Sequence, residues 1–74
     1  MKYIDPDGPI EVLRNELIEL VTDLMQKLSP DDRAFLRDDV IPLLKTDEGY
    51  ARCQARRLVK SAREYGLKVN VTRH

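Results

Sequence analysis

Residues 47–67 read DEGYARCQARRLVKSAREYGL and predict one long helix that ends at a glycine. Asp47, or Thr46 before it, is expected to cap the helix start through its side-chain oxygen. The helix is expected over 47–65. Gly66 suits the left-handed position that commonly follows a helix, because glycine adopts positive φ without steric strain. This segment therefore predicts one of the two long helices of the fold.

Two neighbouring faces of this helix follow from the residue spacing. At about 100° per residue, one arc of roughly 80° gathers small or apolar side chains: Ala51, Ala55, Leu58, Ala62 and Tyr65. The arc beside it, here called the basic stripe, gathers Arg52, Arg56, Lys60 and Arg63. Val59 falls at the boundary between them. We expect the first face to pack closely against the other helices and the basic stripe to flank that contact.

A first helix is predicted over 9–28, with Pro9 at its first position and Asp7 or Gly8 as its cap. Its apolar residues recur at intervals of three and four: Ile10, Leu13, Leu17, Leu20, Leu24 and Leu28. Ile18, Val21 and Met25 widen this stripe beyond a two-stranded coiled-coil seam. The width predicts burial against two elements, or packing inside the chain on one side and self-association on the other.

The second helix is predicted over 30–45, with Ser29 as its cap and Pro30 at its first position. Pro42 lacks a backbone N–H and disfavours helical geometry in the residue before it. It therefore predicts a kink, or a break near 39–42 with a stop near Asp38 and a restart capped by Asp39. The residues expected in the core are Ala34, Phe35, Leu36, Val40, Ile41, Leu43 and Leu44.

The two ends of the chain differ from the helical middle. Residues 1–8 predict an extended lead-in that contains a short strand at 2–4 and turn chemistry after it. Residues 67–72 alternate between apolar and polar side chains, which is the period of a half-buried strand. That strand needs a partner, either the N-terminal segment or another molecule. The sequence thus predicts a single, mainly α domain, a three-helix bundle-like fold with a short C-terminal β-strand.

Charge is balanced in total and segregated along the chain. Residues 1–48 hold 12 acidic and 6 basic side chains, residues 49–74 hold 7 basic and one acidic, and the sum is zero. Cys53 is the single cysteine, so no disulfide within the chain is possible. A lone thiol is typical of a reducing compartment, and no signal peptide or membrane-spanning run is visible. We therefore expect a cytoplasmic protein.

The sequence offers little for catalysis or metal binding. Cys53 and His74 could form a nucleophile–base pair, but no third group is evident to orient them. The adjacent acids Asp31-Asp32 and Asp38-Asp39 could ligate a divalent cation, although solvated helix-start acids explain them more simply. We expect no enzyme activity, no cofactor, no metal site and no small-molecule substrate.

The basic stripe supports two classes of function. Its cations could contact phosphates or an acidic protein surface, or they could be neutralised by the chain's own acids. A base-reading helix-turn-helix is disfavoured, because Asp47 and Glu48 occupy the end that would enter the groove. The candidate residues for binding an acidic partner or nucleic acid are Arg52, Arg56, Arg57, Lys60, Arg63, Lys68 and Arg73. Those for self-association are Leu13, Leu17, Leu20, Leu24, Val69 and Val71.

Of these classes, the sequence favours a small non-enzymatic protein–protein interaction module, such as a homodimer, an adaptor or an inhibitor of a larger protein. Small size and zero net charge carry this preference. The alternative is a small nucleic-acid-binding protein that contacts the phosphate backbone through the basic stripe. No membrane partner is expected.

Overall fold

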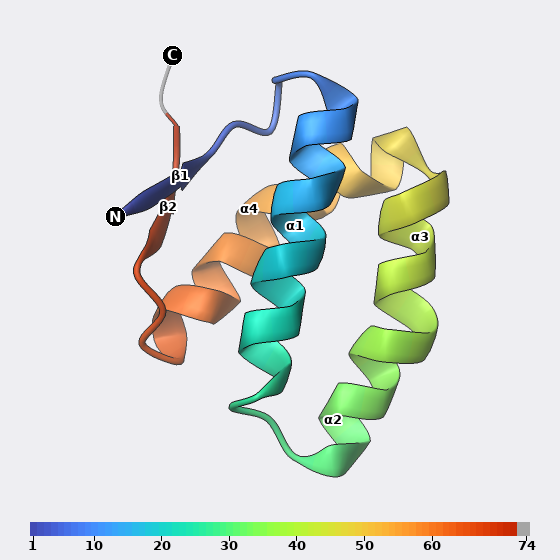
Figure 1. Cartoon of the computed structure of the whole chain (residues 1–74), viewed down its shortest axis with the longest axis vertical. Helices are drawn as coiled ribbons and strands as arrows, with labels where there is room; N and C mark the ends of the chain where they lie inside the picture. Colours follow the sequence, from blue (N-terminus) through green and yellow to red (C-terminus); the bar gives the residue numbers. More distant parts are fainter. Residues whose placement is uncertain (73–74) are drawn as a thin grey trace.

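The computed structural model describes residues 1–72 and is mainly helical (Figure 1). Its elements in chain order are β1 (Lys2–Ile4), α1 (Ile10–Met25), α2 (Pro30–Phe35), η1 (Leu36–Val40), α3 (Ile41–Thr46), α4 (Glu48–Glu64) and β2 (Val69–Val71). The predicted fold class is confirmed: three helical rods, the second of them joined across a proline-containing kink, and a short C-terminal strand. None of the helices within 1–72 has the length and apolar character needed to cross a bilayer.

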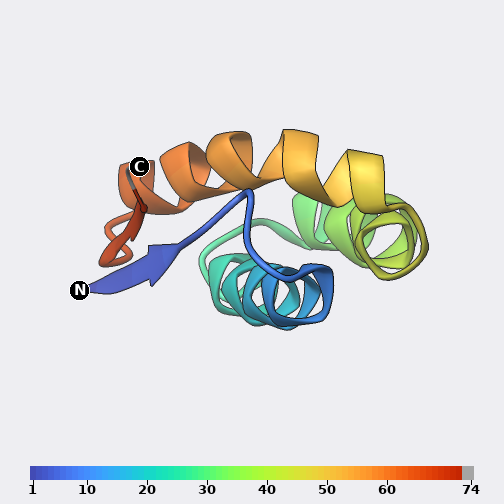
Figure 2. The ribbon, with the colours of Figure 1, turned by 90° about the horizontal axis from the view of Figure 1, so that it is seen from above.

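The helices form two layers. α1 lies beside the rod made of α2, η1 and α3, and α4 crosses over both as the second layer (Figure 2). Ala51, Ala55 and Ala62 are fully buried on the crossing face of α4. Because alanine adds only a methyl group, these positions let the backbone of α4 approach the other helices closely. The predicted small-residue face is therefore the one that closes the core.

The second rod stays helical past Pro42 without a break. Val40 and Ile41 both keep right-handed helical dihedral angles, and no side chain of Asp39 caps a restart. The helix instead widens into a π turn at η1, in which the Ile41 N–H donates to the Leu36 carbonyl five residues back. Of the two outcomes that Pro42 predicted, the kink is the one that the structure adopts.

The π turn also aligns three core side chains. Leu36, Val40 and Leu44 are spaced by four residues, and in a regular α-helix that spacing drifts by about 80° over the two steps. A wider turn holds more residues per revolution and reduces this drift. All three side chains are buried, so one bulge both accommodates Pro42 and keeps the core face continuous.

The ends of α1 differ from their predicted positions. Pro9 is the N-cap and makes no side-chain capping bond, so neither Asp7 nor Gly8 caps the helix. At the other end, the N–H groups of Gln26, Lys27 and Leu28 each bond three residues back, which tightens the chain into turns after Met25. The helix thus spans Ile10–Met25 rather than 9–28.

Capping predictions for the other helices are confirmed. The Ser29 hydroxyl accepts a bond from the Asp32 N–H at 3.4 Å, and the Asp47 carboxylate accepts one from the Tyr50 N–H at 3.0 Å. Gly66 has a φ of 87°, and the Leu67 N–H donates to the Ala62 carbonyl at 3.0 Å. This six-to-one bond is the Schellman arrangement, and it turns the chain back toward β2.

Five residues predicted in the core are more exposed than expected. Phe35 is 58% exposed, Tyr65 47% and Leu43 41%, while Ala34 and Ile41 are half-buried. Phe35 and Leu43 sit next to Leu36 and Leu44 in sequence, and a helix rotates neighbours by about 100°. Because α4 and α1 cover only one side of the second rod, the adjacent apolar positions face outward.

The strand predicted at the C-terminus pairs within the chain. β2 runs parallel to β1, with Lys2 opposite Val69 and Ile4 opposite Val71. Ile4 and Val69 are buried beneath the pair and join the core. The two strands are far apart in sequence, and their pairing places β1 beside β2, which in turn contacts α4 (Figure 1).

Candidate functional site

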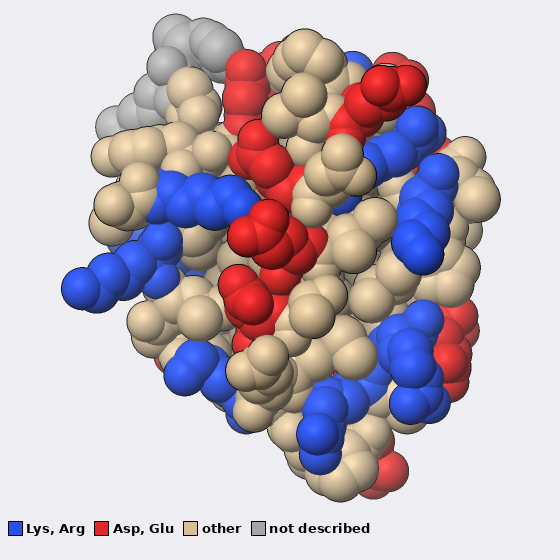
Figure 3. Space-filling view, in the orientation of Figure 1, with Lys and Arg blue, Asp and Glu red and all other residues tan. Residues whose placement is uncertain are grey.

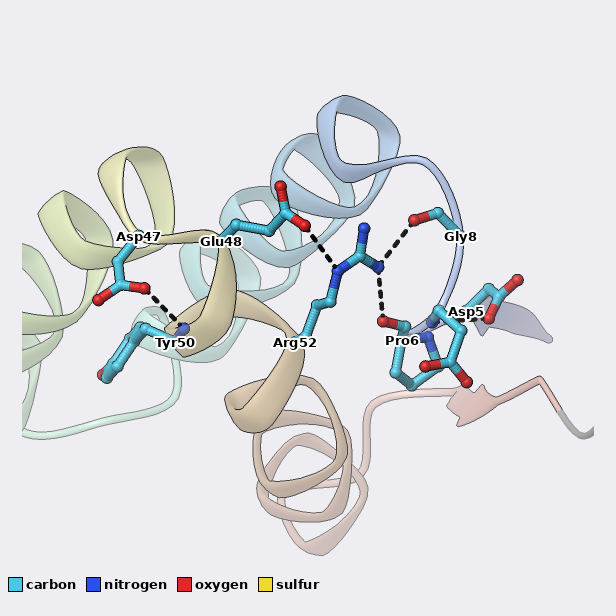
Figure 4. Close-up of polar contacts among 8 residues, drawn as sticks. Asp5, Pro6, Gly8, Asp47, Glu48, Tyr50 and Arg52 are labelled. Carbon is cyan, nitrogen blue, oxygen red and sulfur yellow. Dashed lines mark hydrogen bonds and ion pairs between the residues drawn. The ribbon is translucent and has the colours of Figure 1, made fainter.

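Arg52, the first cation of the basic stripe, is half-buried and bonded to other parts of the chain (Figure 4). Its Nη1 donates to the carbonyls of Pro6 at 3.0 Å and Gly8 at 2.9 Å, and its Nε lies 3.3 Å from Glu48 Oε2. The two carbonyls belong to the turn that joins β1 to α1. Arg52 was predicted as a binding residue, and the structure gives its guanidinium an internal role instead.

The acceptor turn has the chemistry predicted for residues 5–8. The Gly8 N–H donates to the Asp5 carbonyl at 3.2 Å, and the Asp7 N–H donates to Asp5 Oδ1 at 2.9 Å. These bonds direct the Pro6 and Gly8 carbonyls toward α4. Hydrogen bonds from a charged donor are stronger than those between neutral groups. Arg52 therefore links the start of α4 to the N-terminal turn.

The other three cations of the basic stripe lie beside a groove between α4 and β2. The groove has a volume of about 430 Å³, within the range of ligand clefts. Its lining residues are Arg56, Val59, Lys60, Arg63, Glu64, Asn70 and Val71. Val59 is only 2% exposed and forms the floor, half-buried Val71 supplies accessible apolar surface, and Glu64 is the one acid among the three cations. The groove thus combines positive charge with an apolar base and a strand edge.

Asn70 connects the two walls of this groove. Its Oδ1 accepts a bond from Arg63 Nη1 at 3.3 Å and another from the Val71 backbone N–H at 2.8 Å. The sequence placed Asn70 on the outward face of a strand and assigned it no role. An amide side chain in the middle of a three-residue strand, next to a helix rich in arginine, is the signal that could have drawn attention to it.

Arg56 and Lys60 are the available cations. Both are exposed, and neither makes an ion pair or side-chain hydrogen bond within residues 1–72. Arg57 and Lys68 are also exposed but do not line the groove. Arg73, the remaining predicted cation, lies outside the described residues, as does His74. The structure therefore gathers Arg56, Lys60 and Arg63 into one site and leaves Arg52, Arg57 and Lys68 outside it.

Acidic side chains lie mainly on other surfaces. In the view of Figure 3 they form a column down the middle of the molecule, over α1, with cations to either side. Lys2 pairs with Glu19 of α1 at 3.4 Å, and Arg37 pairs with its neighbour Asp38 at 2.9 Å. The Arg37 hydrogen bond lowers the pKa of the Asp38 carboxyl. Within 1–72, these acids do not neutralise Arg56 and Lys60.

The apolar residues proposed for self-association are used inside the chain. Leu13, Leu17, Leu20, Leu24 and Val69 are all buried in the core, and Val71 is half-buried at the groove. The excess width of α1 is satisfied by α4 on one side and by the second rod on the other. The five buried side chains are therefore occupied within the chain, and Val71 is the member of the set that stays partly accessible.

A second, smaller depression was not predicted. It has a volume of about 230 Å³ and lies between the C-terminal halves of α1 and α4 and the helix α2. Phe35 and Tyr65, both expected in the core, stand at this depression with Leu28 and Leu58. It is mainly apolar and carries no basic side chain.

The described residues hold no cluster of metal-ligating side chains. No three His, Cys, Asp or Glu side chains within 1–72 are grouped to share a metal ion. Cys53 is a free, exposed thiol on α4.

Comparison with protein-family models, with curated proteins and with solved structures gave no match to this chain.

Proposed function

We propose that this chain is a small non-enzymatic interaction module that binds an acidic segment of a partner protein in the groove between α4 and β2. The observation that carries the proposal is the pair of cations, Arg56 and Lys60, which make no ion pair within residues 1–72 and lie beside an apolar base. Charge complementarity selects acidic partners and speeds association, and the apolar base supplies burial that charge alone does not.

The same geometry weighs against nucleic acid as the main partner. Strong electrostatic binding of a duplex uses on the order of 6–10 phosphate contacts, and the groove offers three cations. Arg52 is occupied by the N-terminal turn, and Glu48 lies against it. Arg52 therefore does not extend the basic stripe, and fewer cations remain in line to follow a phosphate backbone.

Nucleic-acid binding stays the second candidate, because Arg56 and Lys60 remain exposed with Arg57 on the same helix. Fluorescence anisotropy separates the two. A labelled glutamate-rich peptide and a labelled generic duplex are each titrated with the protein in about 50 mM salt, where phosphate contacts are strong.

The proposal expects the peptide to bind with a modest salt dependence and the duplex to bind more weakly. Tighter binding of the duplex, with an affinity that falls steeply as salt rises, would move the assignment to nucleic acid. Failure of the peptide to bind at about 1 mM, equivalent to less than about 4 kcal/mol, would refute an acidic protein partner. Light scattering on the protein alone shows whether a second copy is that partner.

A further inference from the structure

The free edge of β2 faces the basic groove. In the parallel pair, the Lys2 N–H donates to the Lys68 carbonyl and the Thr72 N–H donates to the Ile4 carbonyl. Backbone groups of a strand alternate in direction, so those of Val69 and Val71 point away from β1. Val71 lines the groove opposite α4. An unpaired strand edge therefore lies within reach of Arg56 and Lys60.

The Asn70 side chain lies where an additional strand would pair with that edge. Its Oδ1 lies 2.8 Å from the outward-pointing N–H of Val71, where the carbonyl of an adjacent strand would accept the same bond. The same oxygen holds Arg63 at 3.3 Å. One side-chain amide thus covers a donor of the free edge and restrains a cation of the groove.

We infer that the acidic partner binds as an added β-strand along β2, and that its backbone displaces the Asn70 side chain. This inference rests on the proposed function and specifies its binding mode. In an added strand, every second side chain points to the same face as Val69 and Val71, which is the α4 side. Acids at alternate positions would therefore face Arg56 and Lys60, and the displaced Asn70 would release Arg63 to a further carboxylate.

Two peptides of identical composition test the strand geometry. Each has about six residues, the usual length of a strand. One alternates glutamate and threonine, and the other carries its glutamates in one block followed by the threonines. We expect the alternating peptide to bind about tenfold more tightly, because only its carboxylates all face α4. Amide exchange of the protein, followed by NMR, should slow at Val71 when this peptide is bound.

Substitutions of Asn70 test the displacement. Asn70→Ala removes the competitor for the Val71 N–H, so affinity for the alternating peptide should rise about two- to tenfold, the equivalent of one net hydrogen bond. Asn70→Asp keeps the acceptor, holds Arg63 more strongly and adds repulsion, so affinity should fall. A fall for Asn70→Ala as well would mean that Asn70 contacts the partner directly, which overturns the displacement.

The outcomes distinguish strand addition from binding of an acidic partner in the groove without strand pairing. Equal affinity of the two peptides, with no slowing of exchange at Val71 in the wild-type protein, overturns strand addition while leaving an acidic partner in place. If neither peptide binds, the proposed function fails and strand addition fails with it. The exchange measurement uses the unmodified protein, so the test does not depend on the variants folding.

Discussion

Arg52 and Arg56 lie one turn apart on α4, and the fold uses them in different ways. Arg52 reaches across to two backbone carbonyls of the β1–α1 turn, with its side chain only 31% exposed. Among residues 1–72, Arg56 has no such contact, and it lines the groove beside β2. Shared position on a helix stripe therefore does not imply shared function. What differs is the neighbouring element: a turn rich in carbonyl acceptors at one end, an open strand edge at the other.

The largest expected effect is on binding at the open end. Replacing both groove cations, Arg56→Glu with Lys60→Glu, sets like charges against an acidic peptide. Such repulsion costs several kcal/mol, so affinity should fall by about 100-fold or more. Anisotropy titration measures the loss, and thermal denaturation should show a nearly unchanged midpoint, because both side chains are exposed.

Arg57→Glu is the matched control for the double exchange. It changes charge on the same helix, at an exposed position that does not line the groove. This change should lower peptide affinity by only about threefold at low salt, because the charge acts on the groove from a greater distance. A loss as large as that of the double variant would show that net charge, and not the groove, governs binding.

The next effect is on stability at the closed end. Arg52→Ala removes a charged donor from two carbonyls, and the free energy of unfolding should fall by about 1–2 kcal/mol in urea titration. Peptide affinity of the folded variant should stay within about twofold of wild type, since Arg52 lies outside the groove. Arg52→Lys should recover only part of the stability, because lysine lacks the planar fork. Weakened binding with unchanged stability would reverse the assignment of the two ends.

Arg63 should behave between these extremes, because it lines the groove and also bonds Asn70. Arg63→Ala is expected to weaken peptide binding about two- to fivefold, the range of an exposed ion pair. The double variant Arg63→Ala with Asn70→Ala tests the coupling: if Asn70 restrains Arg63, the gain from Asn70→Ala is smaller when Arg63 is absent. Strict additivity of the two changes would argue against that restraint.

The smallest effect concerns Arg37, an arginine whose partner is its own exposed neighbour. The pKa of Asp38 is lowered by the Arg37 hydrogen bond. Any stabilisation is therefore present above the ordinary pKa of aspartate and is lost as pH falls through the lowered value. Asp38→Asn should shift the melting midpoint slightly at neutral pH, and the shift should shrink as pH falls below the ordinary pKa of aspartate. A pH-independent shift would point to a cause other than this ion pair.

Much of the architecture was predictable because it follows from local chemistry. The caps at Ser29 and Asp47 and the turn at Gly66 depend on residues within a few positions of each helix end. The groove was only half predictable. Helical spacing identified Arg56, Lys60 and Arg63, whereas Asn70 and the orientation of the β2 edge depend on how the strand lies against α4.

The errors in predicted burial have a common origin. Periodicity marks which residues are apolar on one side of a helix, but not how wide a strip the neighbouring helices cover. Phe35 and Leu43 fall just outside the covered strip, and Tyr65 lies after the last turn of α4. Their exposure is therefore a property of the layer arrangement and could not be read from the helix that carries them.

By itself, the sequence determined the three helical rods, the caps at Ser29 and Asp47, the turn at Gly66, the alanine face of α4 and the basic stripe beside it, because each arises from interactions within a few residues. Tertiary structure alone decided which cations remain available. It placed the carbonyls of Pro6 and Gly8 against Arg52 and the edge of β2 against Arg56 and Lys60, through contacts between segments more than forty residues apart in some cases. Such contacts depend on how the terminal segments are placed relative to α4, and the spacing of residues within one helix does not determine that placement.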